Sequence, residues 1–301
     1  MSLPDALQST FTPLSPEASS AAQLSWLLIG SAVVIFVAVI VLACMAIRSR
    51  PQWLASERTV IVGGVVVPIV LLTLLLVYTA YQGAVLARDG GAALRVEVTG
   101  HQWWWRVRYL DANGALDFET ANEIRLPVGQ RIELALRSAD VLHSFWVPNL
   151  GGKLDMIPGR TNRLTVTPQV AAISRGQCAE YCGGPHAQMA LYVVTAPRED
   201  FDRWRAAQRL PAARADPTFE SRCATCHAIR GSRAVGASGP DLTHVGSRLS
   251  IGAGTLPTDA TQLSRWIASN QHIKPGNLMP AFGEFSPAEL ASLADYLASL
   301  R

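Results

Sequence analysis

The segment Gly176-Gln-Cys-Ala-Glu-Tyr-Cys-Gly-Gly-Pro-His-Ala-Gln-Met189 places two thiols, an imidazole and a thioether in one short, turn-rich loop. Its potential ligands are spaced Cys178-x3-Cys182-x3-His186-x2-Met189. Soft sulfur ligands mixed with imidazole favour copper, whereas a structural zinc site normally has only Cys and His ligands. Small copper-binding β-sandwiches commonly bring an upstream histidine against such a loop, and His143 is the candidate in this chain. The segment therefore predicts a copper site on a β-sandwich.

The region around this loop, residues 94–196, has the pattern of a β-sandwich. Short runs rich in β-branched and aromatic residues alternate with turn signals such as Asn113-Gly114 and Gly151-Gly152. Regularly spaced short strands of this kind are typical of two packed antiparallel sheets. The predicted strands cover residues 94–98, 103–110, 123–126, 131–138, 162–167 and 190–194.

Three further motifs accompany the loop: Gly100-His-Gln-Trp-Trp-Trp105, Val141-Leu-His-Ser-Phe-Trp-Val-Pro148 and Lys153-Leu-Asp-Met-Ile-Pro-Gly-Arg160. Together the four segments resemble subunit II of the haem-copper cytochrome c oxidases. The resemblance implies a cupredoxin-like Greek-key sandwich holding a dinuclear copper centre, CuA, in which two copper ions share two thiolates. The implied ligands are the bridging thiolates of Cys178 and Cys182, one nitrogen each from His143 and His186, the sulfur of Met189 and the backbone carbonyl of Glu180.

Two uncharged runs precede the sandwich, at residues 24–47 and 59–87. Each exceeds the roughly 20 residues that a helix needs to cross a bilayer core. The connecting residues 48–58 contain Arg48, Arg50 and Arg58 but a single acid, Glu57, and this positive bias places the loop in the cytoplasm. We therefore expect a transmembrane hairpin with both termini outside.

Residues 1–23 are rich in Pro, Ser and Ala and contain no Lys or Arg, so we expect a mobile outer tail rather than a secretory signal. Cys44 lies inside the first apolar run, where a lone Cys usually behaves as a small hydrophobe. The net charge of +3 is spread without a Lys/Arg block, so composition gives no support for nucleic-acid binding.

A second domain is expected over residues 216–301, after a linker over residues 197–215. Its signature is Cys223-Ala-Thr-Cys-His227, the arrangement in which two thiols bind haem covalently and the histidine ligates iron. A thiol–disulfide motif needs neither this histidine nor a distal ligand. Met279 is the expected sixth ligand, and His244 and His272 are its rivals.

The stretch Gly239-Pro-Asp-Leu-Thr-His-Val-Gly246 resembles the class I cytochromes c. The resemblance implies that the carbonyl of Pro240 holds the ring N–H of His227 and that Leu242 lines the haem. Ser286-Pro-Ala-Glu289 is a capping box, Thr258 or Asp259 caps another helix, and a third helix should end at the haem motif. The expected architecture is a multi-domain membrane protein with a two-helix hairpin, a cupredoxin-like Greek-key sandwich and a small all-α class I cytochrome c domain.

By resemblance, the chain is the electron-transfer subunit of an aerobic terminal oxidase in a bacterial plasma membrane. Electrons from an outside donor, such as a soluble cytochrome c or an upstream complex, are expected to pass through haem c and CuA to subunit I, which reduces oxygen and pumps protons. Trp103 matches the position where electrons reach the copper domain, although its ring could instead be core or interface bulk. The carboxylate of Glu180 is expected to reach a magnesium or manganese ion at the subunit I boundary.

One position departs from the family pattern. Ile61 stands where the family often has a glutamate on the second membrane helix, and Glu57 is the nearby acid. Two other functions remain open at this point. The chain could be a membrane-anchored CuA and haem c carrier for another reductase, such as one for nitrogen oxides, or a copper-delivery or structural zinc protein.

Overall fold

The computed structural model describes residues 2–49, 51–86, 91–212 and 216–301. Arg50, Ala87 and residues 213–215, which belong to the predicted loop, second helix and linker, lie outside the described residues. The chain divides into a helical unit, Ser19–Gly90, and a globular unit formed by Met1–Ala18 with Gly91–Arg301.

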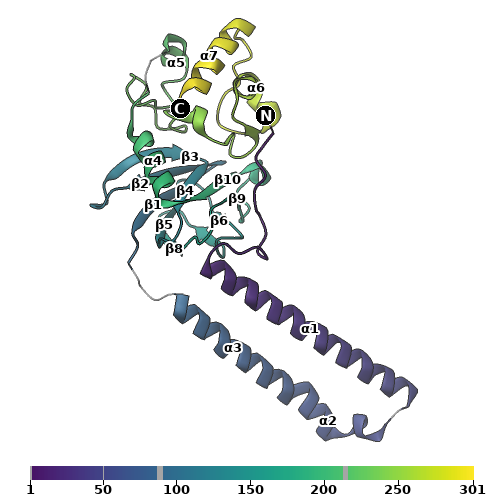
Figure 1. The fold of residues 1–301 in the computed structure, drawn as a ribbon. Helices are drawn as coiled ribbons and strands as arrows, with labels where there is room; N and C mark the ends of the chain where they lie inside the picture. Colours follow the sequence, from purple (N-terminus) through teal and green to yellow (C-terminus); the bar gives the residue numbers. More distant parts are fainter. Residues whose placement is uncertain (1, 50, 87–90, 213–215) are drawn as a thin grey trace. The chain divides into compact units, whose positions relative to one another are not determined.

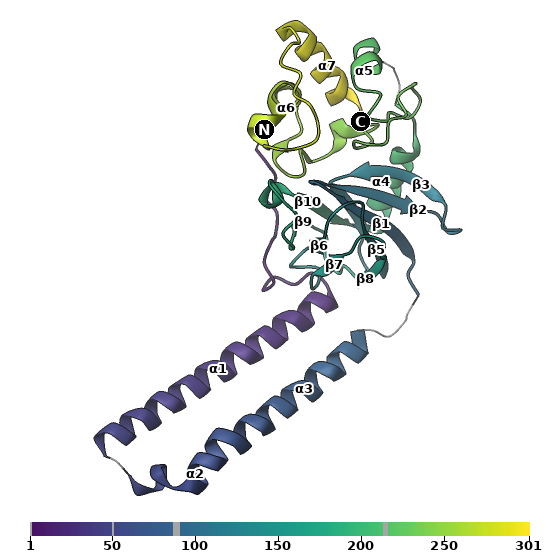
Figure 2. The ribbon, with the colours of Figure 1, turned by 180° about the vertical axis from the view of Figure 1, so that it is seen from behind.

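The helical unit consists of two long apolar helices that run side by side in both views (Figures 1 and 2). The first is α1 (Pro16–Arg48). After η1 (Gln52–Ala55), the second begins with α2 (Glu57–Ile61), widens into the π-helical η2 (Val62–Val66) and continues as α3 (Val67–Leu86). The widening lies just before Pro68, which has no N–H to donate to the helix. Both helices are long and apolar enough to cross a membrane, and their apolar windows are unburied in the unit.

The start of α1 differs from the prediction, because the helix begins at Pro16 rather than at residue 24. Ser15 Oγ accepts a hydrogen bond from Ala18 N (3.0 Å), and Pro16 occupies the first helical position. A serine cap followed by proline is a strong helix start, and it acts here before the uncharged run begins.

The predicted mobile tail is also wrong for the residues that precede this cap. Leu7 N donates to Ile173 O and Arg175 N donates to Leu7 O, both at 2.9 Å, so the tail pairs with the part of β9 that lies beyond its ladder with β6. Leu14 is buried and its N–H bonds to Asn149 O at 2.8 Å. The tail binds because β6 pairs only with the end of β9 and leaves backbone groups of residues 173–175 available, which composition alone does not reveal.

Residues 94–196 form the predicted sandwich of two five-stranded sheets. One sheet has the order β3-β2-β1-β5-β8 and the other β4-β10-β9-β6-β7. Most neighbours are antiparallel, but β1 pairs with β5 and β4 pairs with β10 in parallel. The strands are β1 (Leu94–His101), β2 (Trp104–Leu110), β3 (Leu116–Ala121), β4 (Glu123–Pro127), β5 (Ile132–Ser138), β6 (His143–Trp146), β7 (Leu154–Met156), β8 (Asn162–Val166), β9 (Ala172–Cys178) and β10 (Ala190–Ala196).

Alternation of burial along the strands builds the sandwich core. In β1 every second residue is buried, and the largest core side chains include Trp105, Tyr109, Phe118 and Phe145. The sequence prediction missed β3, β6, β7 and β9. These strands carry polar or short runs, and their pairing comes from the neighbouring strands rather than from their own propensity.

The C-terminal domain is helical, and α5, α6 and α7 are grouped together (Figure 2). It contains α5 (Pro217–Arg222), η4 (Val245–Ser247), α6 (Ala260–Ile273) and α7 (Pro287–Ser299), with one short ladder between β11 (Ser250–Ile251) and β12 (Leu256–Pro257). The capping box at Ser286 and Glu289 is confirmed, and Asp259 rather than Thr258 caps α6. As predicted, α5 ends immediately before Cys223.

Between the two domains, α4 (Arg198–Arg209) packs on the sandwich. Trp204 meets the rings of Tyr109 and Phe118 edge-on at 5.4 and 5.5 Å between centroids. Asp117, at the edge of the sandwich, accepts hydrogen bonds from Arg205 Nε (2.8 Å) and from Arg209 Nε (2.6 Å). Burial opposes ionisation of Asp117, but the hydrogen bonds from the two arginines hold its pKa below the usual range.

We expect Asp117→Asn to lower the free energy of unfolding of the Gly91–Arg301 segment by about 2 kcal/mol at pH 7, because hydrogen bonds to charged groups are the stronger ones. Since the folded pKa is depressed, this contribution is present above the ordinary aspartate pKa of about 3.9 and is lost as pH falls through the lower folded value. Urea unfolding followed by tryptophan fluorescence, at pH 7 and at pH 3, measures both effects.

The matched control is Asp202→Asn, which removes an exposed ion pair with Arg198 on the same helix. We expect it to change stability by less than about 0.5 kcal/mol. A difference for Asp117→Asn that grows as the pH falls would contradict the assigned pairing.

Candidate metal centre and haem site

The copper loop connects two antiparallel strands, because Cys178 ends β9 and Ala190 begins β10. Cys178 Sγ and Cys182 Sγ lie 3.7 Å apart, and both side chains are buried. A metal–thiolate bond is about 2.3 Å long, so metal ions can lie between these two sulfur atoms. The loop thus presents a bridging pair of thiols.

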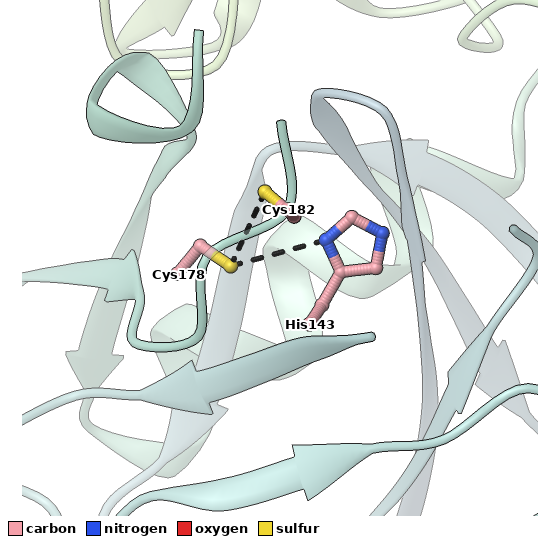
Figure 3. Close-up of side chains that lie close together, drawn as sticks. All are labelled: His143, Cys178 and Cys182. Atoms are coloured by element: carbon pink, nitrogen blue, oxygen red, sulfur yellow. Dashed lines mark hydrogen bonds between the residues drawn. The ribbon is translucent and has the colours of Figure 1, made fainter. Parts of the chain in front are cut away.

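The two imidazoles each face a different thiol. His143 begins β6. Phe145, two residues later, lies opposite Cys178 in the register of β6 and β9, and this register brings the imidazole ring of His143 to the loop. His143 Nδ1 lies 3.8 Å from Cys178 Sγ. Figure 3 shows the side chains of His143, Cys178 and Cys182 close together. His186 Nδ1 lies 3.4 Å from Cys182 Sγ. The ligand atoms of His143, Cys178 and Cys182 all lie within 4.8 Å of one another.

The remaining two predicted ligands complete the set. Met189 Sδ is 3.8 Å from Cys182 Sγ, and the Glu180 carbonyl is 3.2 Å from Cys178 Sγ. Each thiol therefore has one imidazole and one weaker donor beside it. The structure brings together all six groups that the sequence predicted, although their role as ligands stays a prediction.

The electrostatics of the loop fit a metal centre. A hydrogen bond with the Cys182 thiol holds the pKa of Cys178 well below its usual range, and contacts with His143 and backbone groups act in the same direction. The neighbouring Cys178 then raises the pKa of Cys182, because a second negative charge 3.7 Å away is disfavoured. A bound cation removes this repulsion, so two buried thiols at this separation suit a soft metal ion.

Asp140 orients His143, and sequence reasoning did not identify it. Its carboxylate lies 2.7 Å from His143 Nε2, which leaves Nδ1 directed at the sulfur. It also accepts a hydrogen bond from Gln102 N at 2.7 Å. Because Asp140 lies only three residues before His143, the sequence could have indicated this contact. Gly100 leaves room for the His143 ring, because a Cβ at this position would lie 2.8 Å from the ring.

Trp103, in the turn between β1 and β2, contacts the copper loop directly. Its indole Nε1 donates to the carbonyl of Cys182 at 2.9 Å. Gln102 Nε2 donates to the same oxygen at 2.8 Å. The ring is partly buried against the sandwich core. Trp103 therefore touches the backbone of a predicted ligand, whereas Trp104 stacks on His101 at 4.5 Å.

The carboxylate of Glu180 points to a different partner from the predicted divalent ion. It pairs with the ammonium of Lys153 at 3.5 Å, and both side chains are about half exposed. An ammonium group at this distance competes with a divalent cation for the carboxylate. The described residues give the magnesium or manganese site no support.

The haem motif lines a cavity of about 320 Å³. Its walls include Cys223, Cys226, His227, Pro240, Leu242 and Met279, which are all of the predicted haem residues. Residues Gln102, Trp103 and Trp104 of the sandwich also line it. The cavity thus lies against the turn that contacts the copper loop.

His227 is prepared to ligate iron. Its Nδ1 lies 2.8 Å from the carbonyl of Pro240, and because a carbonyl can only accept, this nitrogen carries the proton and Nε2 is left with a lone pair. Burial lowers the pKa of His227, which favours the neutral ring that a metal requires. A Cβ at Gly239 would lie 2.6 Å from the ring, so only glycine leaves room for it.

The two rivals of Met279 do not line the cavity. His244 is buried, and its Nε2 lies 3.0 Å from the carbonyl of Leu210. His272 is exposed on α6. Of the three candidates only Met279 faces the place that haem would occupy.

Arg248 gives independent evidence that the cavity suits haem. It is buried in the cavity wall, burial lowers its pKa, and its Nε has no hydrogen-bond partner. No ion pair is formed by Arg248 within the described ranges. Although Nη2 of Arg248 donates to the carbonyl of Asp241, its buried Nε has no acceptor. A buried cation with a free N–H in a cavity wall suits an anionic group, such as a haem propionate.

The buried pair of thiols is surrounded by soft ligands, and it lies next to a cavity lined by a C-x-x-C-H motif. Two such sites are typical of a protein that carries electrons. With two helices of membrane-spanning length, the fold and sites define a membrane-anchored electron-transfer protein.

Comparison with known proteins specifies the family. The family described as cytochrome c oxidase subunit II, periplasmic domain, matches residues 110–196, and the cytochrome c family matches residues 212–301. Cytochrome c oxidase subunit 2 of Alkalihalophilus pseudofirmus is 35% identical over 254 residues, covering 78% of this chain and 71% of that protein. The same subunit of Bacillus subtilis is 31% identical over 255 residues, covering 78% and 70%.

Among solved structures, the periplasmic domain of subunit II of cytochrome oxidase from Bradyrhizobium japonicum is 31% identical. The match covers 40% of this chain and 97% of that domain, with a TM-score of 0.38. The chain belongs to the cytochrome c oxidase subunit II family and carries a C-terminal cytochrome c domain. The predicted resemblance and fold class are confirmed, and membership implies copper in the sandwich and haem in the C-terminal domain.

We expect Cys182→Ser to remove the absorption and electron-spin signals of a two-copper centre and to reduce bound copper to one ion per chain or fewer. A hydroxyl is a poor bridge between soft metal ions. The haem spectrum should remain, because the haem motif lies in the other domain. Metal analysis and absorption spectroscopy of the purified chain measure both.

Cys44→Ser is the matched control, because Cys44 lies in α1 and should leave both spectra unchanged. Met279→Ala is the reciprocal variant and should alter the haem spectrum alone. Loss of haem from Cys182→Ser would show that the two sites do not form independently.

Proposed function

We propose that the chain transfers electrons within an aerobic terminal oxidase. Electrons pass from an outside donor, such as a soluble cytochrome c or an upstream complex, to haem bound covalently through Cys223 and Cys226, then to CuA and then to subunit I. Oxygen is reduced to water in subunit I, and the reaction is coupled to proton pumping. The partners are subunit I, the other oxidase subunits, the electron donor and the lipid bilayer.

The position of Trp103 carries this proposal. The residue lines the haem cavity, and its indole N–H donates to the backbone carbonyl of Cys182. One residue thus contacts both sites, and no covalent path of comparable length joins them, since Cys182 and Cys223 lie far apart in the chain. Trp103 is the residue that we assign to electron transfer between the domains.

The ligand assignments form part of the proposal. His143, Cys178, Glu180, Cys182, His186 and Met189 hold the two copper ions, and His227 and Met279 ligate the haem iron. When bound, two thiolate-bridged copper ions share one electron, so each bond changes little on oxidation. The chain contributes rigidity, because the two thiols belong to the core of the sandwich and His143 is fully buried beside them.

The orientation in the membrane follows from charge. Arg48 ends α1, and Arg58 with Glu57 begins the second helix, so the connection is the basic end of the hairpin. We propose a multi-pass protein of the bacterial plasma membrane with this connection in the cytoplasm and both termini, the copper domain and the cytochrome domain outside.

The second candidate function is delivery of electrons to another reductase, such as one for nitrogen oxides. The same two sites would serve it, because the acceptor of the electrons is a separate subunit. A copper-delivery or structural zinc protein is disfavoured by the match to the oxidase family over most of the chain.

Purification of the tagged full-length chain from its native membrane tests the proposal. We expect a large haem-bearing membrane subunit to co-purify and the complex to consume oxygen when a reduced cytochrome c or an artificial donor is supplied. Reduction of a nitrogen oxide without oxygen consumption would support the second candidate and contradict the first.

We expect Trp103→Phe to slow the reduction of copper by haem at least about tenfold, which corresponds to about 1.4 kcal/mol in the barrier. The phenyl ring lacks the N–H that reaches the Cys182 carbonyl. The measurement is rapid photoreduction of the haem followed by the copper absorption, in the full chain with both static spectra unchanged.

Trp104→Phe is the matched control, because Trp104 also lines the cavity but stacks on His101 and not on the copper loop. Equal rates in the wild type and in Trp103→Phe would remove Trp103 from the path.

A further inference from the structure

Lys274 is a buried lysine at the boundary between the two domains of the globular unit. It follows α6, is 2% exposed, and is one of only two lysines in the sequence. Its Nζ donates to three backbone carbonyls: Trp103 O at 2.7 Å, Gln188 O at 2.9 Å and Gly252 O at 3.0 Å. Two of these acceptors belong to the sandwich and one to the cytochrome domain.

The three acceptors match the three N–H donors of an ammonium group. No carboxylate is paired with Lys274 in the described part of the chain, and burial lowers its pKa to about 7. A buried ammonium group without a counterion is costly unless hydrogen bonds replace its water. Because two of the replacements come from the sandwich, the surroundings of Lys274 are complete only when the two domains are together.

The acceptors of Lys274 lie next to residues of both redox sites. Gln188 directly precedes Met189, and Trp103 bonds to Cys182. Lys274 itself lies five residues before Met279 and lines the haem cavity. One side chain therefore joins the segment of the predicted haem ligand to that of a predicted copper ligand.

Further hydrogen bonds join the two domains beside Lys274, and together with those of Lys274 they form the Lys274 junction. Gln188 Nε2 donates to Ile273 O at 2.8 Å, and Ala190 N donates to Ala253 O at 3.0 Å. Gly254 approaches so closely that a Cβ there would lie 2.9 Å from Ala190 Cβ. On another part of the boundary, Leu249 N donates to Glu123 Oε2 at 2.7 Å. Arg106 of β2 also donates to the carbonyl of Ala237, so the cytochrome domain is held at several places. Of these contacts among the described residues, only those of the Lys274 junction adjoin the copper loop.

We propose that Lys274 is a positioning residue that locks the cytochrome domain onto the copper loop, so that Trp103 stays in the wall of the haem cavity. Electron transfer between the two sites then occurs in one fixed arrangement of the domains rather than through repeated encounters of a tethered domain. This inference rests on the proposed electron-transfer function.

The test compares Lys274→Met with Arg265→Met in the full-length chain carrying its metals and haem. Methionine keeps the length of the lysine side chain but donates no hydrogen bonds. Arg265 is exposed on α6 of the same domain, which makes it the matched control. The first readout is hydrogen exchange at the amides of Ala190 and Leu249, whose acceptors lie in the opposite domain.

We expect Lys274→Met to speed exchange at Ala190 about tenfold, with a smaller effect at Leu249, because loss of the lock raises the open population at that junction. The static spectra of haem and copper should be unchanged. Copper reduction after photoreduction of the haem should become slower and dependent on solvent viscosity, since domain closure then precedes transfer. Arg265→Met should match the wild type in all three measurements.

Unchanged exchange at Ala190 together with a viscosity-independent, wild-type rate in Lys274→Met would overturn the proposal. If Lys274→Met fails to take up haem, Lys274→Gln decides, because its amide is shorter than the lysine side chain and supplies two N–H donors for the three carbonyl acceptors. Wild-type exchange at Ala190 in that variant would likewise overturn it. Hydrogen exchange at Ala190 does not depend on which subunit accepts the electrons. The exchange result would therefore still test the role of Lys274 if the proposed oxidase function were wrong.

Discussion

Two thiols 3.7 Å apart in a buried loop impose the constraint on which the copper domain depends. A second negative charge at this separation is disfavoured in a low-dielectric interior, so a bound cation would allow both sulfur atoms to be thiolates. The sandwich holds the pair in place from both sides, because the loop is the turn of the β9–β10 hairpin and β6 delivers His143 beside it. Rigid strands thus support a site whose ligands should move little when an electron arrives.

The carbonyl of Cys182 connects this site to the rest of the globular unit. It accepts hydrogen bonds from Gln102 and from Trp103, which project from the turn between β1 and β2 in the opposite sheet. The same turn forms part of the haem cavity. The predicted copper and haem sites consequently share a wall rather than only a linker.

Sequence patterns predicted those features that depend on neighbouring residues. The two apolar runs, the capping box at Ser286 and the helix before Cys223 appear where the pattern placed them. The predictions failed where partners came from elsewhere in the chain. The start of α1 was placed too late because its serine cap lies outside the apolar run. The tail binds because β6 leaves part of β9 without a partner strand.

The amino-acid sequence by itself determined the chemistry of the sites, since residue type and close spacing set which thiols, imidazoles and thioethers can share an ion. It determined neither the geometry nor the junction of the domains. His143 reaches Cys178 across 35 residues, Trp103 reaches Cys182 across 79, and Lys274 reaches Trp103 across 171. Such contacts depend on strand register and on the docking of one folded surface against another, and only the tertiary structure decides these because no local pattern encodes a distant partner.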